Sequence, residues 1–164
     1  LAAGVVQPMT PAGGAHSVVA TKLVYLLLAH VLPRRLGAVF PGDTGFVLRR
    51  GPDTVRCPDV AFVAADRLPP GGVRRGLPEL APDLAVEVRS PTDRTRASRA
   101  KVAEYLGFGV RAVWTIDPDA RTVTVHAPDG AARRLDEGDM LDGGDVVPSF
   151  RCAVAELFEG VARE

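Results

Sequence analysis

The chain has 164 residues, of which 46% are apolar and 24% charged, and this balance predicts one folded domain of ordinary size over residues 1–164. Its formal net charge of zero argues against a general nucleic-acid coat held by bulk charge, but leaves room for a local basic patch. No uninterrupted apolar run approaches the roughly 20 residues of a membrane span, and Cys57 and Cys152 are too few for a disulfide framework, so a cytoplasmic location is expected. The chain begins at Leu1 without an initiating Met, which leaves room for a further segment upstream.

A long helix is predicted first in the chain. Apolar residues recur at helical spacing over residues 15–35, which predicts a largely buried helix that is ended by Pro33 and Gly37. A Pro-Gly-Asp turn then predicts a hairpin between strands at residues 38–40 and 45–48.

Two strands with acidic residues follow. Residues 55–63 are predicted to form a strand that carries Asp59, and the Pro- and Gly-rich residues 67–82 are predicted to form a surface loop. Residues 84–88 then read as a buried strand whose apolar run is interrupted by Glu87.

The second half of the chain alternates between helix and strand patterns. A helix is expected at residues 95–106, where Lys101 and Tyr105 are one turn apart and share a face. This order predicts a mixed α/β fold, of α+β-like character, around a central sheet flanked by helices. The remaining expected elements are strands at residues 110–116, 122–126, 131–135 and 146–147, and a closing helix at residues 154–161.

Glu87 is the residue that most needs an explanation. An ionised carboxylate is rarely buried unless it is paired or coordinates a metal. Asp59 and Lys101 are its candidate partners, and two carboxylates beside a lysine form a hard, oxygen-rich site of the kind that holds Mg²⁺ or Mn²⁺. Plainer interpretations stay open: Asp59 follows a proline as many turn residues do, the second face of the Glu87 strand is wet, and Lys101 lies on an exposed helix face.

Other polar clusters give weaker signals. Asp136, Asp139, Asp142 and Asp145 recur every third residue with glycines between them, which is typical of turns and does not match a calcium loop. His16 precedes the first helix and reads as a neighbour of the N-cap or a solvent-facing imidazole. The common phosphate-loop, dinucleotide, zinc-protease and serine-hydrolase motifs are absent from the sequence.

With these residues in place, the chain resembles the Uma-two family of predicted restriction endonucleases, within the PD-(D/E)XK nuclease superfamily. The matching segments keep the family's order and spacing across nearly the whole chain. They are residues 58–63, 81–84, 87–93, Lys101 with Glu104 and Tyr105, 109–118, and 141–150.

The resemblance implies a restriction-endonuclease-like core with a mixed sheet of four or five strands. It implies that Asp59 and Glu87 bind Mg²⁺ or Mn²⁺ and that Lys101 is the catalytic lysine. His16, Arg89 and Tyr105 are weaker candidates. Arg89 stands where the superfamily usually has its lysine, and Ser149 stands where the family usually has glycine.

The leading hypothesis is therefore a divalent-metal-dependent endonuclease that hydrolyses phosphodiester bonds in DNA. DNA is the expected partner, no membrane partner is expected, and a homodimer is one expected assembly because nucleases that cut both strands are often symmetric. The alternative is a nuclease-fold module that binds nucleic acid or a protein partner without cleaving. A third possibility, a small-molecule metallohydrolase, predicts a closed pocket without a basic rim.

Overall fold

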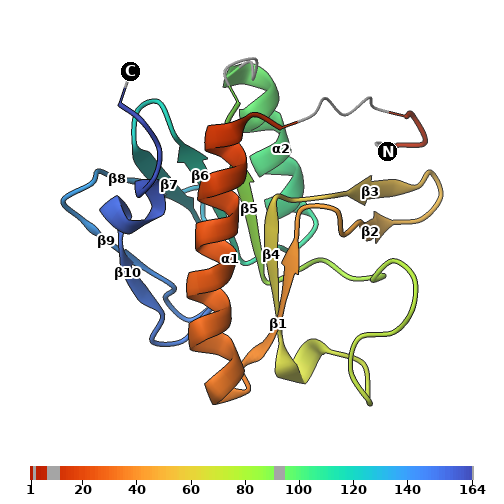
Figure 1. Ribbon diagram of the computed structural model, residues 1–164. Helices are drawn as coiled ribbons and strands as arrows, with labels where there is room; N and C mark the ends of the chain where they lie inside the picture. Colours follow the sequence, from red (N-terminus) through yellow and green to blue (C-terminus); the bar gives the residue numbers. More distant parts are fainter. Residues whose placement is uncertain (2, 7–11, 91–94, 164) are drawn as a thin grey trace.

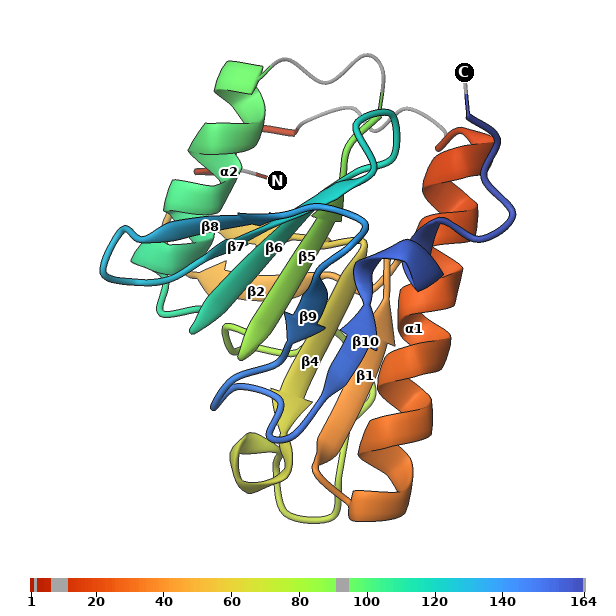
Figure 2. The same cartoon turned by 90° about the vertical axis from the view of Figure 1, so that its left-hand side faces the viewer.

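The computed structural model describes residues 1, 3–6, 12–90 and 95–163. A mixed sheet stands between two helices, one on each face (Figures 1 and 2). Two small two-stranded sheets and two 3-10 helices complete the fold. The elements are α1 (Gly14–Arg34), β1 (Gly37–Pro41), β2 (Phe46–Arg49), β3 (Thr54–Arg56), β4 (Val60–Ala64), η1 (Ala65–Arg67), β5 (Leu84–Val88), α2 (Thr95–Gly107), β6 (Ala112–Asp117), β7 (Thr122–His126), β8 (Ala132–Leu135), β9 (Met140–Asp142), β10 (Arg151–Ala153) and η2 (Val154–Phe158).

The central sheet has six strands in the order β1-β4-β5-β6-β7-β8. Its β5 and β6 run parallel and are connected through α2, whereas its other neighbouring strands are antiparallel. The mixed α/β class is confirmed, but the sheet is larger than the four or five strands that the family resemblance implied. The edge strands β1 and β8 extend it to six.

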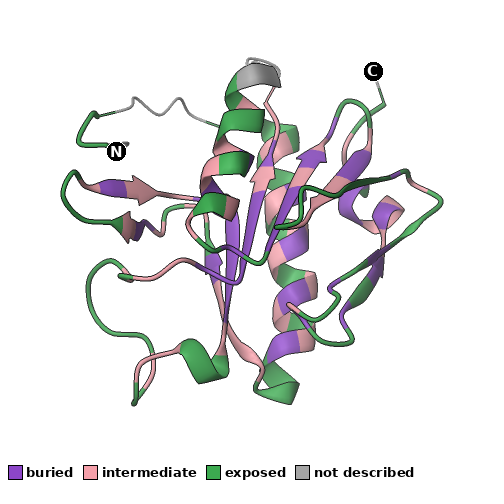
Figure 3. Ribbon diagram, turned by 180° about the vertical axis from the view of Figure 1, so that it is seen from behind, coloured by how far each residue is buried: buried purple, intermediate pink, exposed green. Residues whose placement is uncertain are grey.

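Strand alternation divides the core into two faces. Leu84, Val86 and Val88 of β5 pack into the main core beneath α1, while Ala85 faces Tyr105 of α2 on the other side. Figure 3 shows the buried colour concentrated along the strands and on the inner side of α1. Glu87 belongs to the same face as Ala85, so its carboxylate points toward α2.

Helix α1 follows the predicted helical spacing. Val19, Leu23, Leu27 and Val31 recur every fourth residue and are fully buried against the sheet. The predicted helix over residues 15–35 agrees closely with α1, which includes Pro33 and ends at the following residue. The termination is made by the next residue, Arg35, whose left-handed backbone (φ 53°) lets its N–H bond the carbonyl of Leu32.

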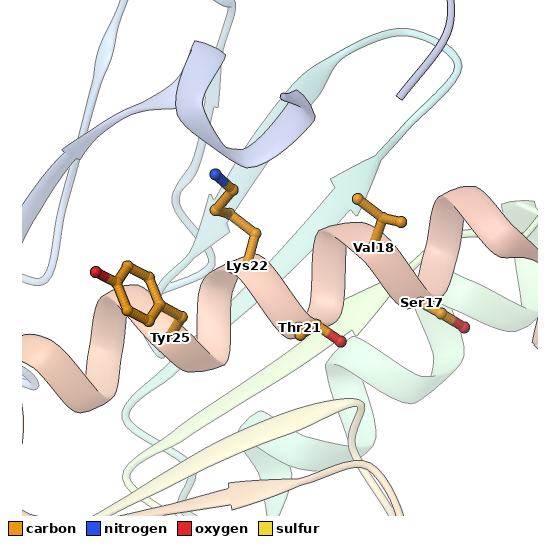
Figure 4. A pocket seen from close by; sticks show the side chains of 5 residues that line it. All are labelled: Ser17, Val18, Thr21, Lys22 and Tyr25. Atoms are coloured by element: carbon orange, nitrogen blue, oxygen red, sulfur yellow. The ribbon is translucent and has the colours of Figure 1, made fainter. Parts of the chain in front are cut away.

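The outer side of α1 is less typical of a core helix. By length and composition alone, α1 is long and apolar enough to cross a membrane, a test that core helices also pass. One stripe of it packs on the sheet, while a shallow hollow on its outer side is lined by Ser17, Val18, Thr21, Lys22 and Tyr25 (Figure 4). The sequence-based expectation of a core helix therefore describes its inner face only.

The predicted hairpin at residues 38–48 is wrong in its pairing. The turn itself forms, since Thr44 N–H bonds the carbonyl of Pro41 at 3.1 Å. However, β1 pairs with β4, and β2 pairs with β3 in a separate two-stranded sheet. Phe40 of β1 is buried in a cluster with residues of β4, and Phe46 of β2 packs edge-on against the same ring, so β1 and β2 meet through side chains and not through a strand ladder.

The predicted strand at residues 55–63 is broken in two. β3 ends at Arg56 and β4 begins at Val60. Pro58 lies in the break, where it has no N–H to donate to a strand ladder. Asp59 therefore immediately precedes β4 instead of lying inside a continuous strand.

The C-terminal region also differs from expectation. Residues 146–147 form no strand, and the small sheet here is made by β9 and β10. The expected closing helix is the short 3-10 helix η2. Trp114 and Phe150 stack with their ring centroids 6.0 Å apart, and they join this region to the core beneath α1.

Candidate active site

The two candidate carboxylates lie on neighbouring strands of the central sheet. In the antiparallel β4–β5 pair, Val60 stands opposite Val86. One further step along this register brings Asp59 opposite Glu87. The site is therefore built by strand pairing, which holds the two backbones about 4.8 Å apart.

Asp59 is fixed by contacts from two elements, β5 and α1. Its Oδ2 accepts a 2.7 Å hydrogen bond from the backbone N–H of Val88, at the end of β5. The Nε2 of His16, in the first turn of α1, lies 3.0 Å from the same oxygen. His16, a weaker candidate from the sequence, thus lies beside Asp59, and the interpretation of a solvent-facing imidazole is wrong.

Glu87 is held by two side chains of α2. Its Oε2 accepts a 2.8 Å bond from Lys101 Nζ, and its Oε1 accepts a 2.8 Å bond from Tyr105 Oη. The i to i+4 spacing of the lysine and the tyrosine places both on the helix face that looks at β5. The structure thus brings together Asp59, Glu87, Lys101, Tyr105 and His16.

The electrostatic environment of Glu87 favours protonation. Burial raises the pKa of Glu87, the ion pair with Lys101 opposes that rise, and the nearby negative charge of Asp59 adds to it. Burial, together with the adjacent Glu87 carboxylate, also raises the pKa of Tyr105 well above its ordinary value, so its hydroxyl stays a hydrogen-bond donor. A cation placed between the two carboxylates would relieve the repulsion that this arrangement maintains.

Arg56 and Glu104 form a support that sequence reasoning missed. Arg56 Nε donates to Glu104 Oε2 at 2.7 Å, and both side chains are largely shielded from solvent. This pair fastens α2 to β3, the strand that leads into Asp59. The partner of Glu104 could not be identified from the sequence, because the two residues are 48 positions apart.

Arg89 does not join the carboxylate cluster. It lies two residues beyond Glu87 on the same side of β5, and its guanidinium pairs with Asp117 at the end of β6. Arg89 therefore lies beside the two acids without bonding either of them among the described contacts. His126 and Thr115 form another nearby pair, with His126 Nε2 3.0 Å from Thr115 Oγ1.

Comparison with known proteins identifies the family of the chain. A family model described as "Putative restriction endonuclease", Uma2, matches residues 1–155. The chain belongs to the Uma2 family. The family resemblance inferred from sequence is thereby confirmed.

The solved structure of another protein has the same fold. The crystal structure of a "putative nuclease" belonging to DUF820, from Anabaena variabilis ATCC 29413, superposes with a TM-score of 0.81. The two chains are 23% identical, and the match covers 94% of this chain and 85% of the other. No curated protein matches this chain. At that level of identity the similarity establishes the fold alone.

The donor set of this Uma2 member fits a hard divalent cation. Mg²⁺ is commonly held by one or two carboxylates, with water and substrate phosphates completing its shell. Asp59 and Glu87 supply that number of carboxylates. Within the described ranges, no group of three or more His, Cys, Asp or Glu side chains is arranged to hold a metal, so a closed zinc-type site does not fit.

The run of aspartates near the C-terminus has an ordinary structural explanation. Asp139 Oδ2 accepts from the N–H of Asp136 at 2.8 Å, and Asp142 Oδ1 accepts from the N–H of Gly144 at 2.7 Å. Both are short-range bonds of the kind that close turns. The sequence-based interpretation of this run as turns is confirmed for these residues.

Proposed function

We propose that this Uma2 protein is a divalent-metal-dependent endonuclease that hydrolyses phosphodiester bonds in DNA. The observation that supports this most directly is the convergence of Asp59 and Glu87 on adjacent strands, with Lys101 bonded to Glu87. The family to which the chain belongs is described in terms of restriction endonucleases, which cut DNA.

Each residue has a distinct proposed role. Asp59 and Glu87 would hold Mg²⁺ or Mn²⁺ through their carboxylate oxygens. When bound, such an ion makes water more acidic and offsets negative charge on a phosphate. Lys101 is the proposed catalytic lysine, because its side chain is 42% exposed while its ammonium contacts a proposed metal ligand. From there it can orient the attacking water or stabilise charge that develops on the phosphate.

His16 and Tyr105 are proposed positioning residues. Each contacts one carboxylate and would fix its orientation, as outer hydrogen-bond partners do in metal sites. Arg89 is assigned no role at the two carboxylates, because its guanidinium pairs with Asp117.

The surroundings of the site favour a polyanionic substrate over a small neutral one. An open groove next to the carboxylates is lined by Arg89, Arg99 and Arg134. A small-molecule metallohydrolase was expected to have a closed pocket without a basic rim, and this groove has the opposite character. Nucleic-acid substrates are attracted by such clustered cations.

The test is nicking of supercoiled plasmid by purified protein, with Mg²⁺ or Mn²⁺ and with chelator. We expect metal-dependent cleavage by the native protein and none by Asp59→Ala. Asp59→Asn should also fail to cleave. Its amide oxygen can still accept the hydrogen bond from Val88 N–H, so this variant separates loss of the charge from loss of the fold. Asp53→Asn, at an exposed ion pair with Arg50, is the matched control and should cleave normally.

A second readout isolates the metal. Calorimetry should detect Mn²⁺ binding by the native protein and lose it in Glu87→Gln. Unchanged Mn²⁺ affinity in that variant would overturn the ligand assignment. If the folded native protein also cleaves neither DNA nor RNA, the result would instead favour the non-cleaving binding module.

Location and assembly are separate proposals. We propose that the protein is cytoplasmic, where its proposed DNA substrate lies. Cell fractionation tests this proposal, because α1 is by length and composition apolar enough to cross a membrane and would then place the protein in the membrane fraction. We also propose a symmetric homodimer for cutting both strands. A monomer by sedimentation in the presence of DNA would refute the dimer.

A further inference from the structure

A polar groove lies on the α2 face of the central sheet, directly beside the carboxylates. Its volume is about 430 Å³, within the range of ligand-binding clefts. Its floor comes from β6, β7 and β8, and residues of α2 form one wall. Figure 2 shows these three strands fanning out beneath α2, away from α1.

The groove is continuous with the candidate active site. In the parallel β5–β6 pair, Thr115 stands next to Glu87, and Thr115 is also part of the groove floor. On α2, Ser98 and Val102 line the groove while Lys101 and Tyr105 bind Glu87. These four residues recur at helical spacing and share one face of α2.

Cations dominate the lining. Arg89, Arg99 and Arg134 are opposed by a single acid, Asp117, which already pairs with Arg89. Arg134 lies 3.4 Å from Asp136, and both of those side chains are mostly exposed. Exposed pairs of this kind contribute little free energy, so Arg134 can exchange this contact for a phosphate.

The neutral part of the lining is made of hydrogen-bonding groups. Thr115, Thr122, Thr124 and His126 present hydroxyl and imidazole groups along the floor. Burial lowers the pKa of His126, so its ring is neutral at ordinary pH and adds no charge. The described lining residues include no Phe, Tyr or Trp on which a base could stack. The groove therefore suits a sugar-phosphate backbone better than an unstacked base.

Its extent also fits a strand of nucleic acid. Arg134 lies on β8, three strands from Glu87 on β5, which corresponds to roughly 14 Å at ordinary strand spacing. At about 3.4 Å per nucleotide in a stacked strand, this covers roughly four nucleotides.

We propose that this groove binds the backbone of the substrate strand on one side of the scissile phosphate, with Arg99 and Arg134 contacting successive phosphates. The inference rests on the proposed nuclease function and adds to it the path of the substrate. It also specifies contacts that carry no base specificity, because they reach only phosphates and sugars.

The experiment measures binding of fluorescein-labelled single-stranded and duplex DNA by anisotropy over a range of salt concentrations, with chelator present to prevent cleavage. The variants are Arg99→Gln, Arg134→Gln and their combination. Arg133→Gln is the matched control, because Arg133 is the adjacent residue of β8, stands opposite Val125 of the main core face, and so points away from the groove.

We expect each groove variant to weaken binding several-fold at low salt and to reduce the slope of log affinity against log salt by about 0.7 to 1. In the double variant the slope should fall by about twice as much, and by the same amount for DNA of any sequence. Arg133→Gln should have the slope of the native protein. Unchanged slopes in folded groove variants, or an equal loss in Arg133→Gln, would overturn the inference.

The outcomes separate the two proposals. Metal-dependent cleavage with unaltered salt slopes would leave the nuclease in place and reject the groove. Groove-dependent binding without cleavage under any metal would support the groove and reject the nuclease, leaving a DNA-binding module on a nuclease fold.

Discussion

At the scale of single residues, Glu87 is the clearest case of a side chain whose placement costs stability. Its carboxylate is only 13% exposed, and burial outweighs the attraction of Lys101 in setting its pKa above the ordinary value. A residue placed only for stability would be apolar here, as the buried Ala85 on the same face of β5 is. Retaining a carboxylate at this position is what a functional site requires.

The raised pKa predicts how stability depends on pH. Below the ordinary pKa of 4.5, Glu87 is protonated in both folded and unfolded states, and its favourable contribution is fully present. That contribution is lost as the pH rises through the folded-state pKa, because the buried group must then ionise. Glu87→Gln should therefore be at least as stable as the native protein at neutral pH, with the difference shrinking on acidification.

Urea unfolding of both proteins over a series of pH values would measure this. Glutamine keeps an oxygen that can accept from Tyr105, so the comparison isolates the charge. A variant that is less stable at neutral pH than the native protein, by a margin that grows with pH, would contradict the prediction.

Ser149 is a second residue whose conformation carries a prediction. Its φ of 62° lies in the left-handed region, where side chains with a Cβ are strained and glycine is not. This explains why the family resemblance places glycine at this position. Ser149→Gly should raise the free energy of unfolding by about 0.5–1 kcal/mol. The reason is that glycine relieves the backbone strain of the folded state by more than it gains in conformational entropy in the unfolded state.

Thermal unfolding of that variant should be compared with Ser17→Gly. Ser17 lies inside α1 and bonds the carbonyl of Gly13, so glycine there should instead destabilise by about 1 kcal/mol. A loss of stability in Ser149→Gly similar to that of the control would refute the strain.

At the scale of elements, α1 shows that helical periodicity identifies a buried face reliably. Leu27 is fully buried beneath the helix, whereas Leu32, on the same helix, is 62% exposed. Leu27→Ala should cost about 2–5 kcal/mol through lost burial and a residual cavity. Leu32→Ala should change stability by less than about 0.5 kcal/mol.

Chemical denaturation of the two α1 variants provides the measurement. Equal costs for both would mean that the outer face of α1 is covered in solution. That result would point to association through the hollow around Tyr25.

Sequence reasoning at this scale succeeded where the signal was local and failed where it was not. The spacing of Lys101 and Tyr105 placed both beside Glu87, because helix geometry fixes which residues share a face. The prediction of a β1–β2 hairpin failed because a turn at residues 41–44 constrains only the turn, whereas the partner of β1 in the sheet is β4, which is more distant in the sequence. Arg56 with Glu104 and Arg89 with Asp117 were missed because their separations of 48 and 28 residues leave no periodic trace.

At the scale of the whole molecule, a formal net charge of zero conceals an uneven distribution of charge. Arg89, Arg99 and Arg134 come from three separate elements and meet only when the sheet and α2 assemble. Acidic residues elsewhere balance them in the total, so composition correctly excluded a uniformly basic coat but could not locate the groove. A local field of this kind acts on a substrate within about 10 Å at moderate salt, whatever the total charge.

The bond from Val88 N–H to Asp59 has an implication for how the site tolerates change. The donor is a peptide group, which every amino acid except proline supplies, so the orientation of the carboxylate does not depend on which side chain occupies position 88. The core residue at position 88 can therefore vary while the spacing of the two acids is kept. Helix α2, in contrast, supplies side chains both to Glu87 and to the neighbouring groove, so a change in its position alters both at once.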